Sequence, residues 1–126
     1  MRHRVAGKKL NRSGGHRTGM RKTMIRQLFT HERLRTTRAK ALSIRGEAER
    51  LITLARNSGE ASDIEKVNAR RNAAARLGND PVIVKKLFDD IGPRFAKRNG
   101  GYTRLYQLGL RQGDAAEMVL LDLVEE

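Results

Sequence analysis

The spacing of apolar residues changes once along this chain, and the change limits the folds that it can adopt. From residue 20 to residue 95, apolar side chains recur mostly at steps of three and four, which is typical of helices with one buried face. After residue 101 they tend to alternate, as they do in strands. Helices followed by a hairpin predict an α+β domain, in which about four helices cover one face of a small mixed or antiparallel sheet.

Two helices are expected in the first half of the chain. The first covers residues 17–30, and the second follows Thr36 and Thr37, which are good N-cap residues, and continues to Arg56. Basic residues lie beside or opposite the apolar stripe of the first helix, so one side packs and the other is positive. The buried faces are predicted to be Met20, Met24, Ile25, Leu28 and Phe29 in the first helix, and Ala41, Ile44, Ala48, Leu51, Ile52 and Ala55 in the second.

Two further helices are expected, one with a weak apolar face and one with an interruption. Residues 60–77 favour helix by composition, so we expect a helix that partly faces solvent. Asn79-Asp80-Pro81 starts the next one, because aspartate is a good N-cap and proline suits the first turn. Gly92-Pro93 is expected to break or kink it. The buried sides are predicted to be Ile64, Val67 and Ala74 in the first of these helices, and Val84, Leu87, Phe88, Ile91 and Phe95 in the second.

The sheet is expected to consist of a C-terminal hairpin that a short earlier strand can join. Val119, Leu121 and Leu123 alternate with more polar neighbours, which marks one face of the hairpin for the core. The strands are predicted over residues 33–36, 102–110 and 117–124, with the turn of the hairpin at 111–114.

The net charge of +13 is concentrated in the first third of the chain. Residues 1–40 hold 13 Lys and Arg against a single acid, Glu32, whereas residues 41–126 hold 14 basic and 13 acidic residues. Residues 1–15 mix glycine, serine and basic residues without apolar periodicity, so we expect an extended basic arm that precedes a single domain of residues 16–126. Charge of this density repels itself in the absence of a polyanionic partner.

Arginine predominates over lysine in the arm and the first helix. Guanidinium groups match phosphate oxygens and stack on bases, and neutralising phosphates releases counterions. Glycines at 7, 14 and 15 allow the backbone to follow an irregular groove. The residues themselves therefore favour a protein that binds structured RNA by its backbone and shape.

Other partners for the basic third stay open on the residues alone. A nucleic-acid packaging protein would carry the same charge, and so would a module that binds acidic proteins. A basic helix can also lie on anionic lipid, although the apolar residues of 20–29 are explained more simply as core. No zinc-finger spacing, zipper heptad or homeodomain-like signature indicates a DNA-binding fold. Tyr102 and Tyr106 are compatible with packing or with base stacking, and Arg104 with RNA contact or solvent exposure.

The sequence offers no catalytic or metal-binding constellation. Cysteine is absent, which excludes disulfides and thiolate metal sites and fits an intracellular location. His3, His16 and His31 fit no local metal motif, and adjacent Asp89 and Asp90 would point about 100° apart on a helix. No phosphate-cradling glycine loop and no apolar run of about 18 residues exists. We therefore expect no enzyme, no cofactor, no metal, no small-molecule substrate and no membrane segment.

Short motifs follow one another through the chain in a recognisable order. They are Met1-Arg2-His3-Arg4, Gly7, Lys9-Leu10-Asn11-Arg12, His16-Arg17, His31-Glu32, Thr36-Thr37, Lys40-Ala41, Glu49, Leu51-Ile52-Thr53-Leu54-Ala55, Lys86-Leu87-Phe88, Gly92-Pro93-Arg94-Phe95-Ala96, Gly100-Gly101-Tyr102-Thr103-Arg104, Gly109, Arg111, Gly113-Asp114 and Met118. In this order, and without large gaps, they resemble the bacterial large-subunit ribosomal protein L-seventeen family. The chain departs from the usual family pattern at Leu42 and Gln107, where basic residues are common.

This resemblance implies a small α/β domain that is a structural component of the large ribosomal subunit. The expected partners are large-subunit ribosomal RNA and neighbouring large-subunit proteins, and the expected location is cytoplasmic, in the ribosome. A basic packaging protein that acts outside the ribosome is the alternative. RNA contacts are expected from Arg2, His3, Arg4, Lys8, Lys9, Arg12, His16, Arg17, Arg21, Lys22, Arg26, Arg35, Thr36, Thr37, Arg38, Lys40 and Arg104.

Overall fold

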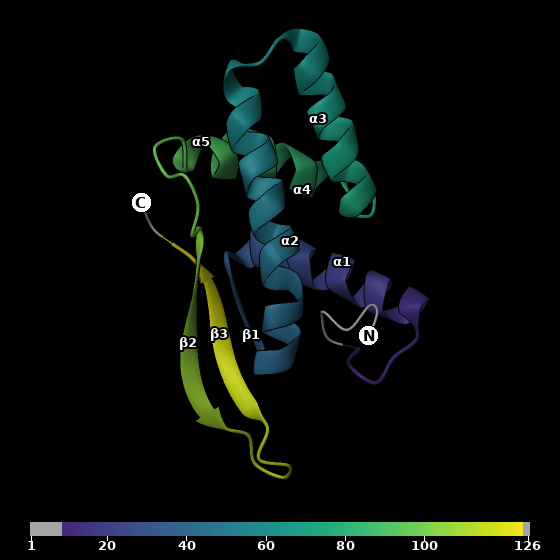
Figure 1. Cartoon of the computed structure of the whole chain (residues 1–126), viewed down its shortest axis with the longest axis vertical. Coiled ribbons are helices and arrows are strands. Elements are labelled where there is room, and N and C mark those ends of the chain that lie inside the picture. The colour runs from purple at the N-terminus through teal and green to yellow at the C-terminus, as the bar shows by residue number, and fades with distance from the viewer. Residues whose placement is uncertain (1–8, 125–126) are drawn as a thin grey trace, which may run out of the picture.

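A computed structural model describes residues 9–124 and confirms the α+β fold, with helices packed on a three-stranded sheet (Figure 1). Residues 1–8, the greater part of the predicted arm, lie outside the described residues. The elements are α1 (Gly14–His31), β1 (Arg33–Thr37), α2 (Arg38–Asn57), a 3₁₀ turn η1 (Ser58–Glu60), α3 (Asp63–Arg76), α4 (Pro81–Lys86), a π-helical turn η2 (Leu87–Ile91), α5 (Gly92–Arg94), β2 (Thr103–Leu110) and β3 (Glu117–Leu123).

Helix α1 begins earlier than the sequence pattern indicates. The side chain of Ser13 accepts a hydrogen bond from the backbone N–H of His16, at 3.3 Å, and so caps the helix. Gly14 and Gly15, which we assigned to the arm, therefore form its first turn. The glycines hid this start, because they have low helix propensity and no side chain to show a periodicity.

The sheet is fully antiparallel and has the strand order β1-β3-β2, so the last strand of the chain lies at its centre. The short early strand does join the hairpin, and Leu34, Leu121 and Leu105 lie side by side across the three strands. Val119 and Leu121 are at most 1% exposed, which confirms the predicted inner face. A bulge between Gln107 and Gly109 shifts the register of the hairpin, which then continues to Leu110 and Glu117.

The apolar stripes of α1 and α2 form the core with this inner face. All six residues predicted for α2 are buried, and Ile25, Leu28 and Phe29 of α1 are fully buried. Figure 1 shows α2 crossing the sheet in front of β1, and α1 running away from the sheet to one side. Gly92 lies where α5 meets α2, because a Cβ atom there would stand 3.0 Å from the Cβ of Ala55.

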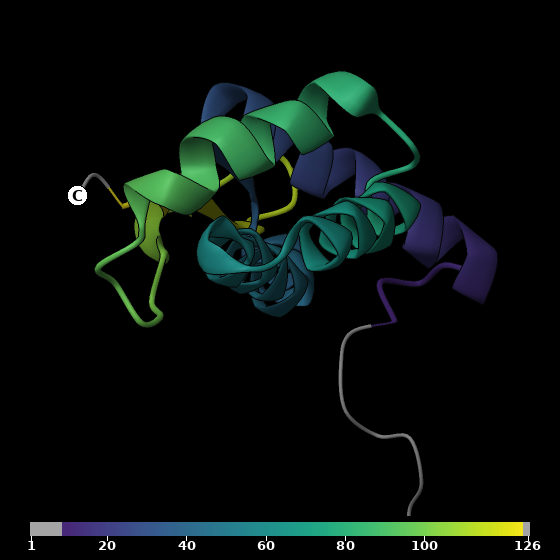
Figure 2. The same ribbon diagram turned by 90° about the horizontal axis from the view of Figure 1, so that it is seen from above.

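The predicted buried face of α3 is wrong for Ile64 and Val67, whereas Ala74 is partly buried against the core as predicted. Ile64 is 75% exposed and Val67 is 47% exposed, whereas the residues that pack are Ala69, Ala73 and the following Leu77. Helix α3 lies beside α2 (Figure 2), and the small alanines through which it packs leave little apolar signal in the sequence. The larger side chains, which carry that signal, lie on the solvent side.

The segment from Pro81 to Arg94 stays helical through Gly92-Pro93, where we expected a break or a kink, but its regular α-helix is interrupted just before them. Asp80 caps its start as predicted, with its side chain accepting from the N–H groups of Val82 and Ile83. A π-helical turn, Leu87–Ile91, precedes Pro93. Proline has no N–H to donate to the preceding turn of an α-helix, and the wider π turn accommodates this missing hydrogen bond. The buried face is confirmed, with Val84, Leu87, Phe88, Ile91 and Phe95 all buried.

Candidate nucleic-acid interface

Helix α1 carries five basic residues that the sequence assigns to RNA: His16, Arg17, Arg21, Lys22 and Arg26. Met24, Ile25, Leu28 and Phe29 form its buried face. Arg17 and Arg21 continue this face toward the N-terminus and are half-buried, and the other three lie beside or opposite it. Within residues 9–124, none of these five side chains forms an ion pair with a carboxylate. Helix α1 therefore presents positive charge that the described part of the fold does not neutralise.

Glu32, the single acid among the first forty residues, serves a different part of the molecule. It ends α1 in a left-handed conformation with φ of 63°, and its carboxylate pairs with Arg94 and, at 3.4 Å, with Nζ of Lys86. The hydrogen bond from Arg94 lowers the pKa of Glu32, and the charge of Lys86 acts in the same direction. Glu32 thus compensates cations from α4 and α5, and those of α1 have no carboxylate partner among residues 9–124.

The first turn of α1 concentrates positive charge further. It contains no acidic residue, although an acid there would interact favourably with the helix dipole. The dipole instead places a partial positive charge beside the side chains of His16 and Arg17. This arrangement is unfavourable for the free helix and favourable for a bound phosphate.

Two predicted contact residues, Arg12 and Arg17, also shape the loop before α1. Nη1 of Arg17 donates a hydrogen bond to the carbonyl of Arg12 at 2.9 Å, and Nη1 of Arg12 donates to the carbonyl of Leu10 at 2.7 Å. Leu10 has a φ of 55°, which costs a residue with a Cβ about 1–2 kcal/mol. These bonds help to hold the bend, and each guanidinium retains further N–H donors.

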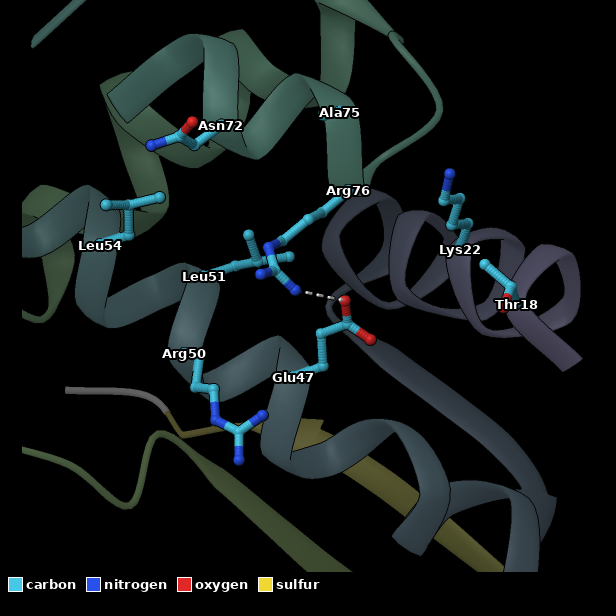
Figure 3. A pocket seen from close by; sticks show the side chains of 9 residues that line it. All are labelled: Thr18, Lys22, Glu47, Arg50, Leu51, Leu54, Asn72, Ala75 and Arg76. Atoms are coloured by element: carbon cyan, nitrogen blue, oxygen red, sulfur yellow. Dashed lines mark hydrogen bonds and ion pairs between the residues drawn. The ribbon is translucent and has the colours of Figure 1, made fainter. Parts of the chain in front are cut away.

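A groove of about 770 Å³ extends the basic surface from α1 onto the neighbouring helices (Figure 3). Lys22 borders it on α1, Arg50 on α2 and Arg76 on α3. Arg76 pairs with Glu47 at 3.3 Å, whereas Lys22 and Arg50 have no ion pair within the described part of the chain. Arg50 and Arg76 were not among the predicted residues, because the sequence pattern indicates that they face solvent but not that α1 lies beside them.

The remaining predicted residues come from a second place, the sheet and the start of α2. Arg35 and Arg104 are exposed, while Thr36 pairs with buried Val119 and so faces the helices. Thr37 is the N-cap of α2, but its side chain makes no capping hydrogen bond. Arg38 stands 3.9 Å from Glu117 in a loose, exposed pair.

Not all of the predicted contact residues fall within the described residues or gather in one place. Arg2, His3, Arg4 and Lys8 lie outside residues 9–124. Lys9 is exposed before α1, and Lys40 is half-buried in the first turn of α2. Figure 1 shows α1 leading away from the sheet, so the predicted residues form one group along α1 and another at the sheet and the start of α2.

Residues 9–124 contain neither a candidate metal site nor a helix that could span a membrane. They contain no group of three or more His, Cys, Asp or Glu side chains that could hold a metal ion. None of the helices described there is both long enough and apolar enough to span a membrane.

Known proteins resemble this chain over nearly its whole length. The family model described as ribosomal protein L17 matches residues 20–124. A protein of Geobacter sulfurreducens is 45% identical over 126 residues, which cover 100% of this chain and 67% of that protein. A protein of Treponema denticola is 44% identical over 125 residues, which cover 99% of this chain and 65% of that protein.

A protein of Trichlorobacter lovleyi is 45% identical over 126 residues and is covered over 95% of its length. All three are named large ribosomal subunit protein bL17. The chain spans about two thirds of the length of the Treponema and Geobacter relatives and nearly all of the Trichlorobacter one. The family match begins within α1 and continues through the other helices and the sheet, and the identities to these relatives cover the same elements. The chain therefore belongs to the ribosomal protein L17 family.

Proposed function

We propose that this protein is a structural constituent of the large ribosomal subunit, where it binds large-subunit ribosomal RNA through its basic N-terminal arm and α1. The observation that carries the proposal is the set of α1 cations without carboxylate partners in the described structure, while the nearby acids Glu32 and Glu47 pair with other cations. Relatives named as large-subunit proteins supply the context.

Different residues of α1 serve folding and RNA binding. Buried Leu28 and Phe29 fix the helix to the domain, so the basic side chains are held in place before RNA arrives. Lys22 and the arginines then neutralise phosphates and release counterions, and the helix N-terminus favours a phosphate near His16. The role is structural rather than enzymatic, with neighbouring large-subunit proteins as further partners in the cytoplasm.

One of the α1 arginines is difficult to explain by stability alone. The Nε atom of Arg21 is buried and has no hydrogen-bond partner within the described residues. An unsatisfied buried donor costs about 1–3 kcal/mol. A binding role for the rest of the guanidinium gives a reason for an arginine at this position.

The salt dependence of RNA binding tests the proposal directly. If the cations contact roughly 6–10 phosphates, the affinity of the full chain for a large-subunit ribosomal RNA transcript should fall by about 10³–10⁵ between 50 and 200 mM salt. A flat response would contradict binding through these side chains.

Fractionation of a cell lysate on a sucrose gradient separates the proposal from the packaging alternative. A ribosomal constituent sediments with large subunits and leaves them only when they are dissociated. Sedimentation with the nucleoid, together with absence from large subunits, would overturn the ribosomal proposal.

A further inference from the structure

The sheet has an outer face, opposite the one on which the helices pack. We propose that this outer face binds unpaired bases of the ribosomal RNA, with Tyr106 as the stacking surface. The inference rests on the proposed function, because it assumes that RNA is the partner, and it adds a second contact of different chemistry away from α1.

The register of the sheet brings the relevant residues together. Leu120 on the central strand lies directly opposite both Arg35 on β1 and Tyr106 on β2. Directly opposed residues point to the same side of a sheet, and neighbours along a strand point to opposite sides. Because Val119 and Leu121 are buried beneath the helices, Leu120 and its two partners belong to the outer face.

A second row lies beside the first on the same face. Asp122 is directly opposite Arg33 on β1 and Arg104 on β2. Nε of Arg33 is 4.0 Å from a carboxylate oxygen of Asp122, which is a weak, exposed pair. Arg35 and Arg104 are exposed and have no ion pair among residues 9–124. The two rows therefore combine one aromatic ring with three guanidinium groups and one carboxylate.

The two tyrosines of the chain have different environments. Tyr102 is 1% exposed, its hydroxyl lies 3.1 Å from Oγ1 of Thr53, and its ring is 5.1 Å from that of Phe95, so it is a core residue. Tyr106 is 43% exposed, and no hydrogen bond of its hydroxyl occurs in the described structure. The packing role that the sequence left open for both tyrosines thus applies to Tyr102, and Tyr106 is free to take a ligand.

The charges on this face favour RNA over a protein as the occupant. Bases stack on exposed aromatic rings without regard to their sequence, and arginine beside the ring contacts the phosphate that follows. The face has an excess of two positive charges, which complements a polyanion. An apolar segment of a neighbouring protein would cover Tyr106 and Leu120. It would also remove the charges of Arg35 and Arg104 from water without offering them an opposite charge or a hydrogen-bond acceptor, which is costly.

Binding by substituted full-length chains tests the proposal, with a large-subunit ribosomal RNA transcript as the probe. Tyr106→Ala should weaken binding about 5- to 150-fold, whereas Tyr106→Phe, which keeps the ring, should bind like the parent. The slope of affinity against salt concentration should stay unchanged in both variants, because no cation is removed.

The outcomes distinguish this proposal from the one it rests on. A parent chain that binds RNA with a steep salt dependence, together with an alanine variant of equal affinity, would overturn the stacking proposal alone. Equal weakening by alanine and phenylalanine would overturn it too, because the hydroxyl and not the ring would then be required. A parent without RNA affinity would overturn both.

Fluorescence gives a second readout that does not depend on how the alanine variant folds. The chain contains no tryptophan, so Tyr106→Trp introduces a single indole. Stacking on a base should quench its emission when the RNA transcript is added, and ultraviolet irradiation of large subunits should crosslink the peptide that contains Tyr106 to RNA. Unchanged emission on saturation with RNA, or a crosslink from this peptide to a neighbouring protein alone, would overturn the proposal.

Discussion

The cations of α1 and those at the junction of α4, η2 and α5 are similar in kind but differ in what surrounds them. Lys86 and Arg94 pair with Glu32, Arg94 also pairs with Asp90 at 3.0 Å, and Lys86 donates a hydrogen bond to the carbonyl of Thr30. In α1, neither Arg21 nor Lys22 forms an ion pair with a carboxylate of the described residues. The first group stabilises the fold, and the second remains available to a partner.

This difference separates two uses of positive charge within one small domain. The cluster around Glu32 joins the end of α1 to the α4–α5 segment, although the residues lie 62 positions apart in the chain. The other cations of the same helix have no ion pair among the described residues, so we expect stability and RNA binding to depend largely on different residues of α1. A substitution is therefore expected to change either the stability of the fold or its affinity for RNA, but not both.

The largest expected effect concerns the buried side of α1. Phe29 is fully buried, so Phe29→Ala should lower the free energy of unfolding by about 3–5 kcal/mol, which chemical denaturation measures. Thr30→Ala, on the exposed side of the same turn, is the matched control and should change little. Equal stabilities of the two variants would mean that α1 is an appendage and not part of the core.

A smaller effect is expected at the cluster around Glu32. Glu32→Gln removes the charge that pairs with Lys86 and Arg94, and the expected loss is about 1 kcal/mol or less, because the side chain is 36% exposed and solvent screens the pairs. RNA affinity should stay equal or rise slightly, since a negative charge is lost. A marked drop in affinity would show that this cluster takes part in binding.

The smallest effect is a change with pH at the same residue. Because the pKa of Glu32 is lowered in the folded state, its ionic contribution is fully present above the ordinary value of 4.5 and is lost as the pH falls through the lowered pKa. The stability gap between the parent and Glu32→Gln should therefore shrink in denaturation experiments as the pH is lowered below 4.5. A gap that persists or widens in acid would assign the stabilisation to packing.

The sequence predicted most of the fold because large apolar residues define most of its elements. The stripes of α1 and α2 and the alternation of β3 were sufficient to assign their buried faces. Helix α3 shows where this reasoning fails, because it packs through Ala69 and Ala73 while Ile64 faces solvent. The π turn before Pro93 also follows from backbone hydrogen bonding, which residue spacing does not reveal.

The candidate interface was predictable as a region but not in its detail. Charge counting singled out the first forty residues, and helical spacing gave α1 a basic side. Which cations remain unpaired depends on contacts between distant segments, such as Glu32 with Arg94. Arg33 was not among the predicted contact residues, although the sequence could have indicated it. Residues 33 and 35 of one strand point to the same side of a sheet, so Arg33 accompanies the predicted Arg35.

The slope of RNA affinity against salt concentration, compared between two charge variants, tests the central claim most directly. The first variant, Arg21→Gln/Lys22→Gln, removes two cations of α1, and the control, Lys85→Gln/Lys97→Gln, removes two exposed lysines of the α4–α5 region that have no ion pair among the described residues. If the α1 cations contact phosphates, the first variant should lose about 0.7–0.9 from the slope for each contact, and the control should keep the slope of the parent. Equal losses in both variants, or no loss in the first, would contradict the assignment of α1 as the RNA-binding element.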